Sequence, residues 1–172
     1  MRNLSVALIF QLGWLACVTS GAGGRPLAAV AAAAAVVACN LWLQRQRLAV
    51  NARLATCVTL AGFAIETLHL SAGVFALAGQ PKLPWLCPVW LLALWAMFAT
   101  LLTGPLAWLS RRYALSALLG AAFAAPNYVA GARLGAITLN ADWLFSVSAL
   151  MLSWALAMPA MVWLADTAES RR

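Results

Sequence analysis

Two residues of this chain carry side chains that could exchange a proton inside an apolar segment. Glu66 and His69 stand at positions i and i+3 within the apolar run 54–78. A helix places such positions on one face, so the carboxyl and the imidazole are expected to lie close together. A carboxyl beside an imidazole suits general acid and base chemistry, and both residues are candidate catalytic groups.

The run that carries this pair is long enough to cross a lipid bilayer. A helix over 54–78 measures about 37 Å, and the hydrocarbon core of a bilayer is about 30 Å thick. This helix places Glu66 near the middle of the membrane. An ionisable group there costs about 2.5 to 3.5 kcal/mol, so it usually faces other helices or a wet cavity. We therefore expect Glu66 to point into the protein.

Small and polar residues share the face of Glu66 on this predicted helix. A helical wheel groups with it Thr59, Gly62, His69 and Gly73. A similar face is predicted on the helix over 113–135, and its members are Ser116, Gly120, Asn127 and Gly131. Because small residues let helices approach closely, we expect the two faces to meet.

The helix over 113–135 also supplies the candidate substrate-binding residues, which are Asn127, Tyr128 and Arg133. Asn127 and Arg133 could line one polar pocket together with the acid and the imidazole. The predicted depth of these groups lets the pocket open to the outer side of the membrane. In this interpretation Arg133 holds an anionic headgroup, because its guanidinium matches such a group in charge and geometry.

A purely structural interpretation of the same residues stays open. Arg133 could extend to the lipid headgroups or pair with Asp142. Asn127 could bond backbone groups that Pro126 sets free, since proline lacks an N–H. Glu66 could be a protonated acid that bonds the neighbouring histidine or a carbonyl, with no part in chemistry.

The composition differs from that of a soluble protein. Of 172 residues, 65% are hydrophobic and 9% are charged, whereas about a quarter of the residues in soluble proteins are charged. The apolar runs predict an all-α fold, a polytopic transmembrane helical bundle of six helices that forms a single integral membrane domain over 1–172. The predicted spans are about 4–22, 26–43, 54–78, 84–109, 113–135 and 143–166.

The positive charges are distributed as a membrane topology requires. The net charge is +7, but the basic residues lie between apolar runs and form no single patch, so no nucleic acid is expected as a partner. Most of the 11 Lys and Arg residues fall on the side of the N-terminus, which predicts that both termini are cytoplasmic. We expect the first apolar run to be retained rather than cleaved as a signal peptide.

No metal site, disulfide or cofactor is predicted. The cysteines lie in apolar runs without the spacing of metal ligands or of a disulfide framework: Cys17, Cys39, Cys57 and Cys87. The Glu-x-x-His spacing also occurs in di-iron helices, but those sites need several more carboxylates. The remaining acids all stand near span ends: Asp142, Asp166 and Glu169.

Three segments of the chain resemble a known family: FQLGWLACV at 10–18, PVWLLALWAMFATLL at 88–102 and LLGAAFAAPNYVAGARLGA at 118–136. Over nearly its whole length the chain is similar to short bacterial multi-pass proteins of the cell inner membrane, classed as domain of unknown function 2878. It departs from the family in having Glu66 where Asp is frequent. Because relatives tend to be encoded near enzymes that resemble cyclopropane-fatty-acid synthases, the resemblance implies a tie to membrane-lipid modification.

Three functions stay open, each with membrane lipids as partners. The first is a membrane subunit or accessory protein that docks a membrane-protein partner or a second copy of itself, with a tie to lipid modification. The second is an intramembrane enzyme that acts on lipids through Glu66 and His69. The third is a small proton-linked transporter that works as a dimer. One acid, one histidine and one arginine are few groups for chemistry, which favours the first function.

Overall fold

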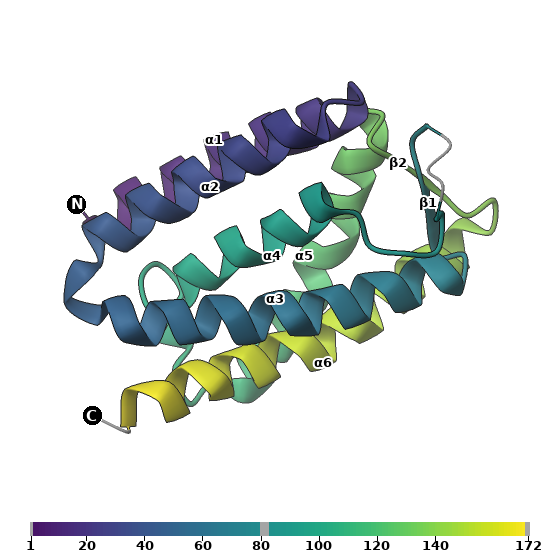
Figure 1. Cartoon of the computed structure of the whole chain (residues 1–172). Helices are drawn as coiled ribbons and strands as arrows, with labels where there is room; N and C mark the ends of the chain where they lie inside the picture. Colours follow the sequence, from purple (N-terminus) through teal and green to yellow (C-terminus); the bar gives the residue numbers. More distant parts are fainter. Residues whose placement is uncertain (1, 80–82, 171–172) are drawn as a thin grey trace.

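Six α-helices form a bundle in the computed structural model, which describes residues 2–79 and 83–170 (Figure 1). Their bounds are α1 Arg2–Ala22, α2 Pro26–Leu43, α3 Leu48–Ser71, α4 Val89–Leu102, α5 Tyr113–Arg133 and α6 Trp143–Ser170. Two 3₁₀ helices, Arg45–Arg47 and Ala107–Leu109, and two strands, β1 Phe75–Leu77 and β2 Ile137–Leu139, complete the described elements. The predicted helical bundle is confirmed. Within the described ranges, five helices are long and apolar enough to cross a membrane, all except α4.

The third predicted span, 54–78, differs from the helix that forms. α3 begins at Leu48 and ends at Ser71, and residues 75–77 form strand β1. The cause is Gly73, whose φ of 69° turns the chain out of the helix at little cost because glycine has no side chain. Glu66 therefore lies near the C-terminal end of α3, which corrects the expectation that it lies at the middle of the span.

The fourth predicted span, 84–109, also differs from the structure. α4 has 14 residues, which is about 21 Å of helix and too short to cross the hydrocarbon core alone. Prolines limit it on both sides, because Pro88 precedes it with an extended backbone (ψ 153°) and Pro105 follows it after a turn. α4 instead packs among the longer helices α1, α2 and α3. The other four predicted spans coincide with helices, apart from shifts at their ends.

The chain leaves α3 and α5 through the same kind of turn. After α3 the backbone N–H of Val74 donates to the carbonyl of His69 at 2.9 Å, and after α5 the N–H of Ala136 donates to the carbonyl of Gly131 at 3.0 Å. These bonds define a helix end that needs one residue in the left-handed conformation. A glycine occupies that position in each turn: Gly73 (φ 69°) and Gly135 (φ 79°).

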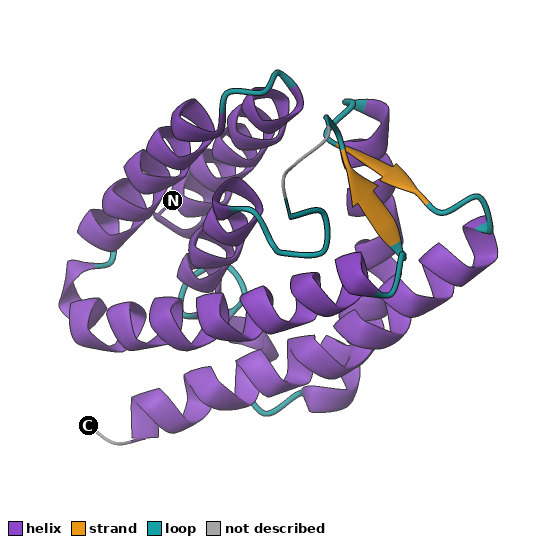
Figure 2. Cartoon of the chain, turned by 45° about the vertical axis from the view of Figure 1, so that its right-hand side comes forward, coloured by secondary structure: helices purple, strands orange, loops and turns teal. Residues whose placement is uncertain are grey.

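The two turns lead into a pair of short strands, and the pairing of these strands joins the end of α3 to the end of α5. β1 and β2 pair antiparallel (Figure 2), with Ala76 opposite Thr138 at the centre of the pairing. Each of these central residues stands at the same distance beyond its turn glycine. The chain therefore contains two units of the same local construction, α3 with β1 and α5 with β2, whose strands pair antiparallel.

Two glycines on the predicted small-residue faces lie in close contact with neighbouring helices. Gly62 of α3 lies against the ring of Trp95 in α4, whereas Gly120 of α5 lies against the backbone carbonyl of Trp154 in α6. The small-residue face of α3 thus packs on α4, and that of α5 packs on α6. This corrects the expectation that the two faces meet each other.

Both ends of the described chain lie at the same end of the bundle. Figure 1 shows the start of α1 at Arg2 and the end of α6 at Ser170 on one side. At this end Arg47 forms a salt bridge with Glu169, which ties the start of α3 to the end of α6. Whether this end faces the cytoplasm depends on the orientation in the membrane, and the cytoplasmic location of both termini stays a prediction.

A buried polar network connects α2 with α4 near the same end. The side-chain amide of Asn40 donates to the hydroxyl of Thr100 at 2.9 Å, and the amide of Gln44 donates to the Thr100 carbonyl at 3.0 Å. The hydroxyl of Thr103 lies 3.1 Å from the amide oxygen of Gln44. Hydrogen bonds of this kind hold helices together where lipid supplies no polar partner.

Replacing Gly62 by alanine is expected to destabilise the bundle, because the new Cβ would lie 2.2 Å from ring atoms of Trp95. Overpacking of this kind costs about 1–3 kcal/mol. Gly131→Ala is the matched control, since a Cβ at that position meets Ile137 at an ordinary 3.9 Å. Unfolding of both purified variants in mixed micelles, followed by circular dichroism as the SDS fraction rises, measures the difference. Equal stability of the two variants would contradict the close contact.

Candidate functional site

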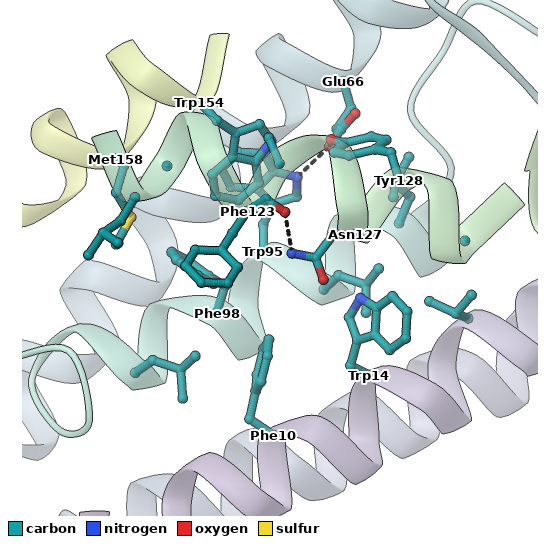
Figure 3. Close-up of a pocket in the computed structure, with 18 of the residues that line it drawn as sticks. Phe10, Trp14, Glu66, Trp95, Phe98, Phe123, Asn127, Tyr128, Trp154 and Met158 are labelled. Carbon is teal, nitrogen blue, oxygen red and sulfur yellow. Dashed lines mark hydrogen bonds between the residues drawn. The ribbon is translucent and has the colours of Figure 1, made fainter. Parts of the chain in front are cut away.

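Glu66 is held by groups from three helices. Its side chain is 1% exposed. The indole N–H of Trp95 in α4 donates to Oε1 at 3.1 Å, and the hydroxyl of Tyr128 in α5 donates to the same oxygen (Figure 3). Nδ1 of His69, on the same helix as the acid, lies 3.3 Å from Oε2. The expectation that Glu66 points into the protein beside His69 is therefore confirmed.

His69 extends this network to α6. Its Nε2 lies 3.0 Å from the hydroxyl of Ser153, a residue that the sequence analysis does not identify. The Ser153 hydroxyl donates to the carbonyl of Leu150 at 3.0 Å, so its oxygen is left to accept a hydrogen bond from Nε2–H. Nδ1 of His69 is then the ring nitrogen that faces Oε2 of Glu66.

Serine, histidine and acid follow one another here in the order of a nucleophilic triad. The surroundings do not suit attack on a substrate, however. Ser153 lies inside α6 with its hydroxyl engaged by a backbone carbonyl. Neither Ser153 nor His69 lines the cavity that adjoins Glu66. The arrangement is suited to holding the carboxyl of Glu66 in place rather than to nucleophilic catalysis.

The three candidate residues of α5 have different positions. Tyr128 bonds Glu66 directly. Asn127 is exposed, donates to the carbonyl of Phe123 at 2.7 Å, and lines the cavity next to Tyr128. Arg133 is exposed at the end of α5 and lies outside the residues that line the cavity. The structure thus brings together four of the five predicted site residues and leaves Arg133 apart from them.

A cavity of about 440 Å³ adjoins Glu66. Its walls come mainly from α1, α4, α5 and α6 and are largely aromatic and aliphatic. Figure 3 shows Phe10 and Trp14 of α1 on one side and Phe123 of α5 on the other. Trp154 of α6 stacks on the ring of Trp95, with ring centroids 4.9 Å apart, and closes the end near the acid. Polar side chains gather at this end: Glu66, Asn127 and Tyr128.

The cavity lies beside Gly131 of α5. This glycine occupies the position in the α5–β2 unit that His69 occupies in the α3–β1 unit. His69 of α3 reaches Ser153, and α3 packs on α6 there. The position of α5 that stands at the same distance before its turn glycine is Gly131, which lines the cavity. A Cβ at 131 would meet its nearest neighbour at 3.9 Å. Glycine at this position therefore leaves open the space between α5 and α4.

No group of three His, Cys, Asp or Glu side chains gathers in residues 2–79 and 83–170 in a way that could hold a metal ion. Glu66 and His69 supply two such ligands, and their neighbours in the network are a phenol, an indole and a serine hydroxyl. Indole has no lone pair for a metal, and its N–H is a donor only. The site is therefore described by hydrogen bonds and apolar contact.

The fold and this site define a class of protein, a helical bundle with helices long and apolar enough to cross a membrane, a buried acid and an apolar cavity beside it. The chain belongs to the family described as protein of unknown function (DUF2878), whose model matches residues 3–160. The resemblance seen in the sequence is thereby confirmed. Comparison with curated proteins and with solved structures gave no match.

Two partners of the site, Trp95 and Ser153, escape the sequence analysis. Each is one of several tryptophans or serines in apolar helices, so neither its type nor its neighbours distinguish it. A signal for the link between α3 and α5 does exist in the sequence. Glu66 precedes Gly73 by the same number of residues as Tyr128 precedes Gly135. Comparing the two helix–glycine–strand units would have paired the acid with the phenol.

The hydrogen bond between Tyr128 and Glu66 is expected to couple the two residues energetically. Tyr128→Phe removes a donor from a buried carboxyl, at a cost of about 1–3 kcal/mol. Glu66→Gln keeps the shape of the side chain and replaces the carboxyl with an amide. In a double-mutant cycle on unfolding in SDS mixed micelles, we expect a coupling energy of about 0.5–3 kcal/mol, because the two side chains are in contact.

The control for this cycle is Tyr113→Phe, which removes a hydroxyl that bonds Asp166 at the exposed end of the bundle. Combined with Glu66→Gln, its effect should be additive, since the two sites share no partner. Additive effects of Tyr128→Phe and Glu66→Gln would show that their hydrogen bond does not stabilise the protein.

Proposed function

We propose that the protein is a multi-pass membrane protein that binds a small, mainly apolar ligand in the cavity between α1 and α5. The observation that carries this proposal is the cavity of about 440 Å³, with aromatic and aliphatic walls and a few polar groups at one end. Ligand sites in proteins measure about 300–1,000 Å³ and combine mainly apolar walls with a few placed polar groups. The cavity has both properties.

A location in the membrane would give an apolar ligand a route to the cavity through the lipid. Five apolar helices of membrane-crossing length support multi-pass insertion. Large apolar side chains are exposed on the outer faces of the helices that flank the cavity, such as Leu12 of α1, Leu118 of α5 and Leu156 of α6. Acyl chains would cover these faces. With membrane lipids as its surroundings and the bacterial inner membrane as its location, the protein could take up an apolar ligand from the lipid phase.

An accessory role fits the site better than an enzymatic one. His69 and Ser153 lie outside the cavity lining, so a bound molecule would not reach them. Glu66 reaches the cavity, but Trp95 and Tyr128 already engage one of its oxygens. An accessory protein that holds an apolar molecule for a separate enzyme is consistent with the expected tie to lipid modification. A membrane-protein partner or a second copy of the chain stays a prediction.

A proton-linked transporter is the second candidate, and the repeated helix–strand units favour it. Several secondary transporters consist of repeats with the substrate at the repeat interface. Here Glu66 of the first unit meets Tyr128 of the second, beside the cavity. A transporter must also open the site to the opposite side of the membrane. Movement of a bound probe into proteoliposomes under an imposed pH gradient distinguishes it from a binding protein.

The proposal is tested with the neutral dye N-phenyl-1-naphthylamine, which accepts excitation energy from tryptophan. The cavity contains Trp14, Trp90, Trp95 and Trp154. We expect saturable energy transfer to the dye with the purified protein in dodecyl maltoside micelles, after subtraction of empty micelles. Gly131→Leu should weaken binding by at least about tenfold, since its side chain fills the cavity without backbone conflict.

The matched control is Ala122→Leu, which adds bulk to the same helix at an exposed position outside the lining. It should bind the dye as the unmodified protein does. Equal dye binding by Gly131→Leu and the unmodified protein, with both folded by circular dichroism, would refute a ligand site in this cavity.

A further inference from the structure

The charge of the cavity restricts the class of ligand. Among the described residues that line it, Glu66 carries the only ionisable carboxyl, and the lining includes no Lys or Arg. Arg133, the basic residue at the end of α5, is exposed and lies outside the lining. His69 lies beyond the acid and also outside the lining. A bound molecule would therefore meet the carboxyl group of Glu66 and no basic side chain.

The walls strengthen the same preference. Aromatic rings from four helices surround the space, and those of Trp14, Trp90, Phe98 and Phe123 line it together with the stacked pair at its end. Aromatic faces carry negative potential and attract cations, most strongly where water is excluded. These negative faces do not attract an anion. An anion in this cavity would lose its hydration without gaining a counter-charge.

Glu66 also lies where it could serve a cation. Its Oε1 accepts two hydrogen bonds, from Trp95 and Tyr128, and these fix the orientation of the carboxyl. The two donors belong to α4 and α5 and fix the carboxyl of Glu66 from both helices. The carboxyl therefore need not change its orientation when a ligand enters. The carboxyl thus gives the apolar cavity one fixed negative pole.

We infer that the ligand is a lipophilic organic cation, an amine or an onium group on an apolar body, with the charge placed between Glu66 and the aromatic rings. This inference rests on the proposed ligand-binding function and names the chemical class of the ligand. It excludes fatty-acid carboxylates and the phosphate groups of lipids as occupants of the polar end. Such anions would need a cation in the lining, and the exposed Arg133 does not supply one.

The test uses two probes of nearly the same size and shape and of opposite charge, tetraphenylphosphonium and tetraphenylborate. Each is titrated against the protein with bound N-phenyl-1-naphthylamine in dodecyl maltoside micelles. Tetraphenylphosphonium should displace the dye at a concentration at least about tenfold lower than tetraphenylborate. Glu66→Gln should reduce this preference, because the aromatic walls alone attract the cation less than they do together with the carboxyl. Asp142→Asn, the same acid-to-amide change at an exposed position outside the lining, should retain it.

The outcomes separate the two proposals. If the dye does not bind, the proposed function fails. If the dye binds and tetraphenylborate displaces it as well as tetraphenylphosphonium does, the inference about charge fails alone. Should Glu66→Gln not fold, as judged by size-exclusion chromatography, the preference of the unmodified protein decides the question. A preference of undiminished size in folded Glu66→Gln would also overturn the inference.

Discussion

The burial of one carboxyl group is the constraint on which the bundle depends. In an apolar interior an unpaired acid is costly, and neither acyl chains nor leucine side chains can bond it. Glu66 finds its partners on other helices, in Trp95 of α4 and Tyr128 of α5, and through His69 it is linked to Ser153 of α6. Satisfying this one group therefore requires four helices to meet at one point.

The repeated units explain how the chain achieves this convergence. The same turn, with glycine at its left-handed position, ends α3 and α5 and starts the two paired strands. The strand pair sets the two helices at corresponding heights, so Glu66 and Tyr128 stand at equivalent positions. The units differ one helical turn further on, where α3 has His69 and α5 has Gly131. The matching positions of Glu66 and Tyr128 thus form the acid site. The replacement of a histidine by a glycine in the second unit leaves space for the cavity.

The sequence was sufficient for the part of the site that lies on one helix. The i, i+3 spacing and the cost of an acid in lipid predicted that Glu66 and His69 are neighbours inside the protein. The partners on other helices were beyond it, because helix pairing depends on contacts between distant segments. Asn127 and Tyr128 are adjacent polar residues, yet the phenol bonds the acid and the amide faces the cavity. Gly73 was assigned to a helix face, although it ends the helix.

The size of the cavity argues that it does not stay empty. Its volume of about 440 Å³ is within the range of ligand sites, and its lining includes exposed side chains such as Phe123 and Asn127. A larger side chain at 131 would fill part of the space, since a Cβ has room there. An acyl chain or a ligand in this space would bury its own apolar surface against the aromatic walls, and under the proposed function its binding would stabilise the fold.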